Sequence, residues 1–296
     1  MKHIFIINPA ANSGSDKKEL EDRINALNVE TEIYKTKGEK DATAFVSSYI
    51  KENGDDVRFY ACGGDGIANE VMNGLVNTNA EFAVIPCGTG NDFVKAFGGA
   101  DKFTLENVVN GEKRKIDCIK IGDTYCVNVC NFGFDAIVGK TANEMKLKGA
   151  KDPYGKGIQK AIFTGMHNKI SVEADGELLN ESGKMLLCTL ANGQYVGGQF
   201  FCAPKSEPDD GLIDVCLVKV ISLFKFLSIL KPYTNGEHLG DPRFANIMKY
   251  RRAEKVRMYS DKEFYICVDG EIYSGKEFVA EIVPKSVNFV QPVARG

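Results

Sequence analysis

Residues 57–92 decide the fold: VRFYACGGDGIANEVMNGLVNTNAEFAVIPCGTGND. Two apolar runs, 57–61 and 82–85, each lead into a glycine-rich turn, and a helix-like segment follows each turn. A helix N-terminus carries unpaired N–H groups and partial positive charge, and glycine lets the backbone approach a ligand closely. Turns of this kind therefore favour phosphate binding. Two of them this close in the chain predict neighbouring loops at one edge of a parallel sheet.

The pattern around this stretch predicts two different architectures. Up to about residue 115, strand-like runs alternate with helix-like runs such as 16–27 and 42–50, an order that predicts a parallel sheet with helices on both faces. Beyond Lys115 the runs are strand-rich and are separated by turns such as Asp175-Gly176, which is typical of an antiparallel sandwich. Helix-like insertions at 135–167 and 222–231 interrupt that region. We expect an α/β N-terminal domain and a β-rich C-terminal domain.

Composition narrows the class of protein. A chain of 296 residues, 44% of them hydrophobic, can form two domains, and its net charge of −3 argues against a general nucleic-acid binder. The nine cysteines are scattered without a CxxC pair, and only three histidines are present, so a zinc site is not expected. No apolar run reaches the roughly 20 residues that span a bilayer. We expect a soluble cytoplasmic protein with reduced thiols.

The two glycine turns together carry a family resemblance. Gly63-Gly64-Asp65-Gly66 with Asn69-Glu70, followed by Gly88-Thr89-Gly90-Asn91-Asp92, resembles the diacylglycerol kinase catalytic domain family of lipid kinases. Neither turn has the spacing of a Rossmann or Walker motif. Ile67 stands where that family more often has threonine, so we expect backbone rather than hydroxyl contacts to phosphate at this position.

The resemblance implies a nucleotide site and a division of the chain. It implies an ATP-binding domain of residues 1–115 plus 286–296, to which the last strand returns, and a lipid-side domain of residues 116–285, with a catalytic cleft between them. Asn8, Ser13 and Gly14 are ordinary turn residues by themselves. The resemblance and the glycine turns together predict fourteen residues in contact with the nucleotide: Asn8, Ser13, Gly14, Thr36, Gly63, Gly64, Asp65, Gly66, Asn69, Glu70, Gly88, Thr89, Gly90 and Asn91.

Acidic residues suggest where magnesium and the acceptor lie. Asp65 suits a magnesium ion held through water, although capping of its own turn is the commoner role for such an aspartate, and we expect Asp92 to be structural. Asp209-Asp210-Gly211 is an ordinary tight turn that also resembles a family element. That resemblance implies a structural magnesium ion bound by Asp210 and by main-chain oxygens of Glu207 and Leu212.

Two further acidic positions match the family pattern. Asp135 matches a family aspartate that holds the two domains together. Asp269-Gly270 is a common hairpin sequence, and a glutamate after it is usually a solvated strand residue. The resemblance implies that Glu271 is instead the general base, because phosphoryl transfer needs a carboxylate that takes the acceptor's proton.

Three segments are candidates for transient contact with a membrane surface. Residues 221–230 place Leu223, Phe226, Leu227 and Leu230 on one side of a helix-like run, and residues 140–170 and 249–257 are locally basic. Packing on a core and a solvated charged face are the alternative interpretations. Apolar contact combined with basic residues would give weak, reversible binding at the inner face of a membrane.

We interpret the sequence as that of an ATP- and magnesium-dependent lipid kinase of phospholipid biosynthesis, which phosphorylates the hydroxyl of diacylglycerol or a related lipid alcohol. The alternatives are a soluble-substrate kinase of the NAD kinase type and a non-catalytic nucleotide-binding sensor. The second glycine motif favours the lipid kinase, and intact Glu271 and Asp210 argue against the sensor. The acceptor lipid stays open, as does the choice between a monomer and a homodimer.

Overall fold

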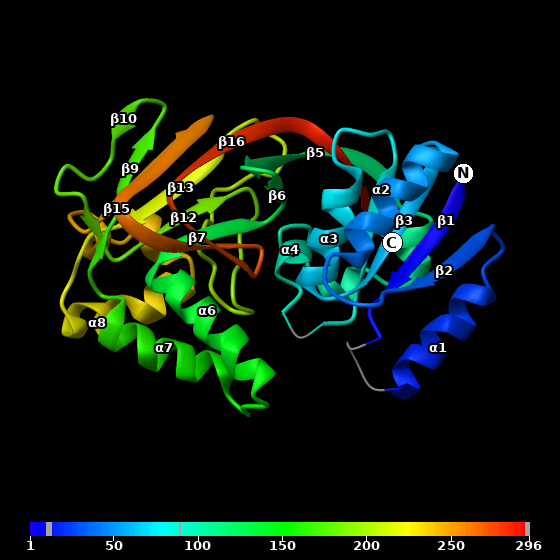
Figure 1. Ribbon diagram of the computed structural model, residues 1–296, viewed down its shortest axis with the longest axis horizontal. Helices are drawn as coiled ribbons and strands as arrows, with labels where there is room; N and C mark the ends of the chain where they lie inside the picture. Colours follow the sequence, from blue (N-terminus) through cyan, green and yellow to red (C-terminus); the bar gives the residue numbers. More distant parts are fainter. Residues whose placement is uncertain (10–13, 89, 294–296) are drawn as a thin grey trace. The chain divides into compact units, whose positions relative to one another are not determined.

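The computed structural model describes residues 1–9, 14–88 and 90–293 and divides into two compact units (Figure 1). The first unit comprises Met1–Cys118 and Pro284–Gly296, and the second comprises Ile119–Val283. Strand β16 (Glu271–Gln291) runs through the second boundary, so its first part belongs to one unit and its last part to the other.

The first unit is built on a parallel sheet, as predicted. Its strands are β1 (Lys2–Ile7), β2 (Thr31–Lys35), β3 (Val57–Gly63), β4 (Glu81–Pro86) and the end of β16, in the order β2-β1-β3-β4-β16. Every neighbouring pair is parallel. All of β3 is buried, as expected of a strand whose sheet is covered on both faces.

Helices connect these strands. They are α1 (Gly14–Asn25), α2 (Asp41–Asn53), α3 (Asp65–Leu75), α4 (Asp92–Lys95) and α5 (Leu105–Val109), with a 3₁₀ turn at Ala100–Lys102. Helices α2 and α3 pack closely at Gly74, where an added Cβ would lie 2.7 Å from Cβ of Val46. The helix predicted after the second glycine turn is α4, and it has only four residues.

An aromatic cluster fixes the last strand in the first unit. Phe289 of β16 lies with its ring centre 5.0 Å from that of Phe93 and 4.6 Å from that of Phe97. Phe82 of β4 and Phe103 complete the cluster. Because Phe93 belongs to α4, the cluster also holds the segment that follows the second glycine turn.

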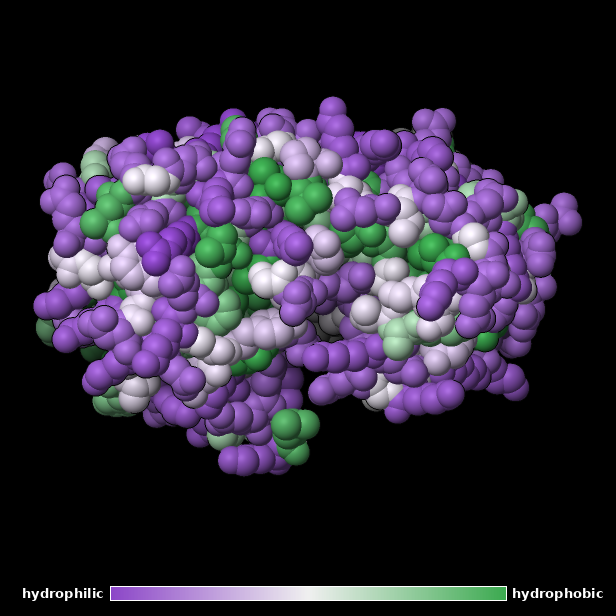
Figure 2. All heavy atoms as spheres, turned by 45° about the horizontal axis from the view of Figure 1, so that its top comes forward, coloured by the Kyte–Doolittle hydropathy of each residue, from purple (hydrophilic) through white to green (hydrophobic). Residues whose placement is uncertain are grey.

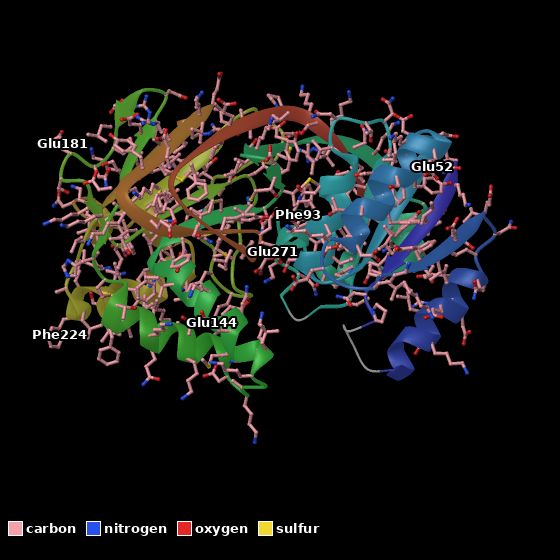
Figure 3. The ribbon with its side chains drawn as sticks, in the orientation of Figure 1. Glu52, Phe93, Glu144, Glu181, Phe224 and Glu271 are labelled. Atoms are coloured by element: carbon pink, nitrogen blue, oxygen red, sulfur yellow. The ribbon has the colours of Figure 1, made fainter. Side chains whose placement is uncertain are left out.

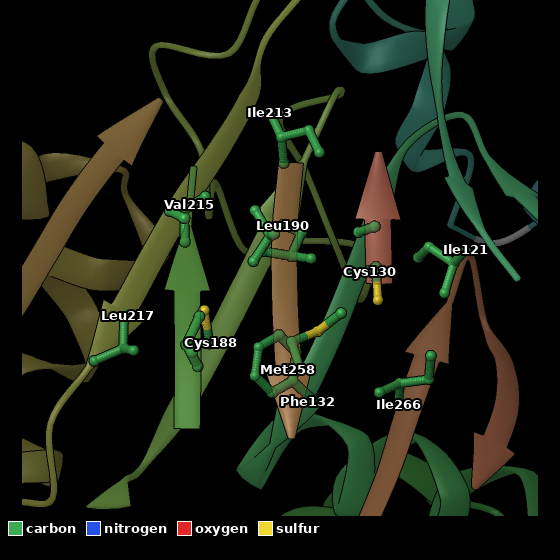
Figure 4. Close-up of a cluster of buried hydrophobic side chains, with 14 of the residues drawn as sticks. Ile121, Cys130, Phe132, Cys188, Leu190, Ile213, Val215, Leu217, Met258 and Ile266 are labelled. Carbon is green, nitrogen blue, oxygen red and sulfur yellow. The ribbon is translucent and has the colours of Figure 1, made fainter. Parts of the chain in front are cut away.

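The second unit is β-rich. Antiparallel strands follow the order β14-β13-β12-β7-β15-β16. Strand β9 pairs with residues 256–259 of β15. The bounds not yet given are β5 (Glu112–Ile121), β6 (Thr124–Cys126), β7 (Val129–Gly133), β8 (Asn168–Lys169), β9 (Ser171–Ala174), β10 (Glu177–Leu178), β11 (Lys184–Met185), β12 (Leu187–Ala191), β13 (Ile213–Val218), β14 (Met248–Ala253) and β15 (Lys255–Val268). Figure 4 shows the apolar core of this unit, which includes Phe132, Leu190, Val215 and Met258.

Three helices cover part of this sheet: α6 (Phe134–Leu147), α7 (Pro153–Thr164) and α8 (Leu223–Thr234). The 3₁₀ turns Glu237–Leu239 and Pro242–Phe244 follow α8. Asp152 caps α7 by accepting the N–H of Gly155, and Ser222 caps α8 by accepting the N–H of Lys225. These helices match the predicted insertions. Within the described residues, none of the helices combines the length and apolar character needed to cross a bilayer.

A buried ion pair joins two strands of the first unit. Nε of Arg58 on β3 donates to Oε2 of Glu81 on β4 over 2.7 Å, and both side chains are buried. The Arg58 guanidinium also donates to the carbonyls of Val108, Val109 and Gly111, at the end of α5. One side chain therefore links the sheet to the C-terminus of a helix.

Arg58→Met should lower the free energy of unfolding by about 3–5 kcal/mol, because it leaves the Glu81 carboxylate buried without its main partner. The double variant R58M/E81M should lose less than R58M, since no orphaned charge remains. Denaturant unfolding of the two variants and the wild type measures both values. A loss below about 1 kcal/mol in R58M would contradict this account of the pair.

Candidate functional site

Four loops of the first unit lie along one edge of its parallel sheet. The register pairs Ile7 with Lys35 and with Cys62, and Gly63 with Pro86, so the carboxyl ends of β1 to β4 are aligned. Asn8, Thr36 and the two glycine turns follow these strand ends. This edge is where ligands of parallel α/β sheets bind.

The two glycine turns touch through their backbones. An added Cβ on Gly88 would lie 2.5 Å from Cα of Gly64, which real Cβ atoms do not tolerate. The N–H of Cys87 also donates to the carbonyl of Gly63 over 2.9 Å. Glycine is therefore required at this crossing for a steric reason, and the turns form one backbone surface.

Asp65 joins the first turn to the second. Its Oδ1 accepts the N–H of Phe93 over 3.1 Å, and an added Cβ on Gly90 would lie 3.0 Å from its Oδ2. Asn91 closes the second turn on itself: Oδ1 accepts the N–H of Gly88, and Nδ2 donates to the Gly88 carbonyl over 2.7 Å. Asn91 has φ of 49°, a left-handed conformation that asparagine tolerates.

This backbone surface suits phosphate groups. Gly64 is the N-cap of α3 and offers no side-chain acceptor to the N–H groups of the first turn, so anionic oxygens can take them. The missing Cβ atoms of Gly64 and Gly88 let the two turns meet at this surface. Because α4 is one turn long, the second glycine turn can supply backbone N–H groups but little helix dipole.

Other predicted nucleotide contacts occupy packing positions. Glu70 accepts the N–H of Ala42 in the first turn of α2, and Asn69 is buried with its Oδ1 bonded to Asn73. Thr36 is also buried. Ser13 and Thr89 lie outside the described residues, and Gly14 is the first residue of α1. Nucleotide binding by these residues stays a prediction.

In the second unit, Asp269 anchors the tip of the β15–β16 hairpin. Its carboxylate accepts the backbone N–H groups of Val127, Asn128 and Val129 over 2.7–3.1 Å and the thiol of Cys126. Asp269 and Gly270 both have left-handed φ, as a tight hairpin requires. The sequence interpretation treated this aspartate only as a turn residue, because its partners lie about 140 positions away in the chain.

Helix α6 holds the other side of the tip. Nδ2 of Asn143 donates to the Gly270 carbonyl over 3.0 Å, and Gly139 faces Cys267, whose Sγ would lie 3.2 Å from an added Cβ. Glu271 follows as the first residue of β16, with an exposed side chain at the hairpin tip (Figure 3). A carboxylate presented on a turn that is fixed from two sides is suited to accept a proton from a bound hydroxyl.

Comparisons with known proteins decide the family. The diacylglycerol kinase catalytic domain matches residues 2–121, and the YegS C-terminal NAD kinase beta sandwich-like domain matches residues 128–291. A diacylglycerol kinase of Bacillus subtilis is 30% identical over 236 residues, covering 76% of this chain and 77% of its own. The chain belongs to the diacylglycerol kinase family.

Further relatives agree with this assignment. A probable YegS-like lipid kinase of Shewanella frigidimarina is 30% identical over 261 residues, which cover 85% of this chain and 81% of its own. The crystal structure of a putative diacylglycerol kinase from Bacillus anthracis superposes with a TM-score of 0.77 at 22% identity, over 100% of this chain and 98% of that one. The predicted fold class, an α/β domain with a β-sandwich domain, is confirmed.

In this lipid kinase family member, the Asp210 turn combines acidic oxygens with an arginine. Oδ1 of Asp210 accepts the N–H of Leu212 over 3.0 Å, and its carboxylate forms an ion pair with Arg252. Asp214 is buried behind it, which raises the pKa of its carboxyl group, and accepts the hydroxyl of Tyr250. The sequence placed Asp214 at the end of the family element that begins at Asp209 but assigned it no role in the magnesium site.

The same turn contains buried oxygens that a cation could bind. Ser206 Oγ and Asp214 Oδ2 lack a hydrogen-bond partner within the part of the chain that the structure describes, and Oδ2 of Asp210 is the oxygen that contacts Arg252. No three His, Cys, Asp or Glu side chains among those residues are grouped to hold a metal by themselves. Hard oxygen donors of this kind fit magnesium only with main-chain oxygens or water completing the shell, and Arg252 would compete for Asp210.

Asp135 is a second titratable group beside the hairpin. It lies in the first turn of α6, and burial raises the pKa of its carboxyl group to about 7. The thiol of Cys267 is close to both Asp135 and Glu271: burial is the main cause that raises its pKa to about 12, and both carboxylates add to it. The structure therefore brings Asp135 and Glu271 to the same part of the second unit.

Asp135→Asn should remove part of the pH dependence of stability. The folded-state pKa of about 7 lies above the ordinary value of 3.8, so the folded protein binds more protons than the unfolded chain between those values. Stability that depends on Asp135 is therefore lost as pH rises through this window. The melting temperature of D135N minus that of the wild type should grow from pH 5 to pH 8. Asp123→Asn, an exposed control, should give a constant difference, and the same constancy in D135N would contradict the assignment.

Proposed function

We propose that this protein transfers the γ-phosphoryl group of ATP to the hydroxyl of diacylglycerol or a closely related lipid alcohol. The observation that carries the proposal is the contact of the two glycine turns at Gly64 and Gly88, joined by Asp65, in a chain of the diacylglycerol kinase family. That surface offers backbone N–H groups at the sheet edge where nucleotides bind in folds of this class. The B. subtilis relative carries the name diacylglycerol kinase.

The chain's own residues have separate parts in this reaction. The N–H groups of the first turn of α3 and of the second glycine turn hold the phosphates and neutralise their charge. Glu271 takes the proton of the acceptor hydroxyl as its oxygen forms the new bond to the γ-phosphorus. The bond between that phosphorus and the β,γ-bridging oxygen breaks, and ADP leaves with the bridging oxygen.

The positions of these residues are stabilised by neighbours that need not touch the substrates. Asp269 and Asn143 fix the turn that presents Glu271, and Asp65 fixes the second glycine turn through the N–H of Phe93. A magnesium ion bound with the nucleotide would add positive charge at the phosphates. Asp65 is the residue that would meet it through water, and the turn at Glu207, Asp210 and Leu212 would hold a structural ion.

Glu271→Gln should lower kcat on diacylglycerol by at least about 100-fold with little change in the KM for ATP, because the amide cannot take up the proton. Glu263→Gln, an exposed carboxylate on β15, is the matched control and should be unaffected. Transfer of labelled γ-phosphate is measured with diacylglycerol, other lipid alcohols and NAD in mixed micelles. Turnover of E271Q at the wild-type rate would remove Glu271 from the mechanism. Labelling of NAD in place of every lipid would overturn the proposed function.

Magnesium should raise the melting temperature of the wild-type protein without nucleotide, since an ion bound at the Asp210 turn binds only the folded state. In Asp210→Asn the increase should be lost. Glu181→Gln, an exposed carboxylate of the same unit, is the control and should keep it. Thermal unfolding with magnesium and with excess chelator measures the shift. An equal shift in D210N and E181Q would place the ion elsewhere.

A further inference from the structure

Asn128 is a buried polar residue of the second unit whose side chain is only partly satisfied. Much of the face drawn in Figure 2 is hydrophilic, as on most proteins, but a polar group in the interior needs a partner or a purpose. Asn128 is only 6% exposed, and its Oδ1 has no hydrogen-bond partner among the described residues. A buried acceptor without a donor lowers stability. The reason for an asparagine at this position therefore lies in what else it holds.

Asn128 lies between two segments at one end of the sheet. Strands β12, β7 and β15 are neighbours in that order (Figure 1). Asn128 directly precedes β7, whose first residue, Val129, pairs with Ala191 at the end of β12. On the other side, the N–H of Asp269 donates to the Val129 carbonyl over 3.1 Å. The tip that carries Glu271 and the segment that leaves β12 therefore flank Asn128.

Asn128 forms hydrogen bonds to both of these segments. Towards the tip, its N–H donates to Oδ1 of Asp269 over 3.1 Å. Towards the other segment, its carbonyl accepts the N–H groups of Asn192 and Gly193 over 2.9 and 2.8 Å. Its Nδ2 also donates to the carbonyl of Tyr195 over 3.0 Å. One residue thus joins the tip to the segment after β12 through its main chain and its side chain together.

The Asn128 side chain also occupies the space that Gly193 leaves open. An added Cβ on Gly193 would lie 2.0 Å from Oδ1 of Asn128 and 3.3 Å from its Cα. Real Cβ atoms do not tolerate the shorter distance, so position 193 needs glycine as long as Asn128 is present. The amide and the glycine therefore set the spacing between the two segments.

The carbonyl that accepts from the Asn128 amide belongs to a rigid hairpin. Val196 and Phe200 exchange two main-chain hydrogen bonds. The rings of Tyr195 and Phe201 stack beside them with centres 4.5 Å apart. The N–H of Phe201 donates to the carbonyl of Thr234, the last residue of α8, in the helical layer formed by α6, α7 and α8. The Tyr195 carbonyl is therefore a fixed point to which Asn128 ties the tip.

We propose that Asn128 is a positioning residue for the general base: its amide ties the tip of the β15–β16 hairpin to Tyr195 and so fixes where Glu271 lies when the acceptor hydroxyl loses its proton. Asn128 acts through Asp269 and needs no contact with either substrate. The inference rests on the proposed function for the role of Glu271, whereas the mechanical link does not. Proton transfer requires hydrogen-bond distance, so a small displacement of the base is costly.

Asn128→Ala should lower kcat on diacylglycerol by at least about tenfold and leave the KM for ATP unchanged, because only the base is displaced. Asn180→Ala is the matched control. Asn180 is 5% exposed, and its amide bonds the main chain at Ile170 and Val172 on both sides. Its strand partner, residues 256–259, is at the opposite end of β15 from the tip. N180A should lower the melting temperature at least as much as N128A, yet keep the wild-type kcat.

Combining N128A with E271Q separates positioning from a general structural role. If Asn128 acts through Glu271, N128A/E271Q should have the kcat of E271Q within about twofold, because a glutamine that takes no proton loses nothing by being displaced. A purely structural role would multiply the two losses. Labelled γ-phosphate transfer to diacylglycerol in mixed micelles measures all four proteins.

Gly193→Ala perturbs the same joint from the other side. Its Cβ would displace Oδ1 of Asn128, so kcat should fall without a change in the KM for ATP. In N128A/G193A the clashing amide is gone, and kcat should rise to that of N128A. A further loss in the double variant would contradict the paired role of these two residues.

Amide hydrogen exchange tests the link without lipid or nucleotide. N128A should speed exchange at residues 127–129 and 269–271 by at least about tenfold, whereas N180A should leave those amides at the wild-type rate. Wild-type exchange in N128A, multiplied losses in N128A/E271Q, or equal kcat losses in N128A and N180A would each overturn the proposal. A wild type that phosphorylates no lipid alcohol would instead refute the proposed function, and the exchange rates would still decide whether Asn128 holds the tip.

Discussion

The contact between the backbones of Gly64 and Gly88 is the constraint on which the candidate nucleotide site depends. Gly88 cannot carry a Cβ without pushing the first turn away, because the added atom would lie 2.5 Å from Cα of Gly64. The parallel register of β3 with β4 brings the turns to this distance, and Asp65 holds them there through Phe93. The site thus results from the sheet, and glycine is the residue that this geometry permits at position 88.

The last strand, β16, helps to position the second glycine turn, although the two are far apart in sequence. Phe289 packs against Phe93 and Phe97, which follow the second glycine turn. Phe82 lies beside it on β4, one strand away. Since α4 is too short to be stable by its own hydrogen bonds, these rings and the Asp65 carboxylate fix the segment. Packing of β16 is therefore coupled to the position of the phosphate-binding surface.

Sequence reasoning succeeded where the information is local. Hydrophobic runs, glycine turns and their order along the chain predicted the parallel sheet, the β-rich second region and the helical insertions. It failed where long-range contacts decide. The Asp269 carboxylate meets backbone donors at residues 127–129, and no local pattern marks such partners. Phe226 and Leu227 are adjacent apolar residues, and only the tertiary structure determines which one faces the core.

The two basic segments, residues 140–170 and 249–257, show the same limit, because the sequence alone does not reveal which of their charges are paired in the fold. Both read alike as lysine- and arginine-rich sequence, yet strand pairing places acidic partners opposite one segment and none opposite much of the other. Strand β16, which pairs with β15, supplies Glu281 and Glu277, because cross-strand positions are where opposite charges are stabilised, and Glu177 of β10 pairs with Arg251. A helix that packs by one face has no such neighbour on its outer face. Unpaired charge thus collects on the helical layer as a consequence of architecture, and the exposed aromatic rings of α7 and α8 lie within that charge.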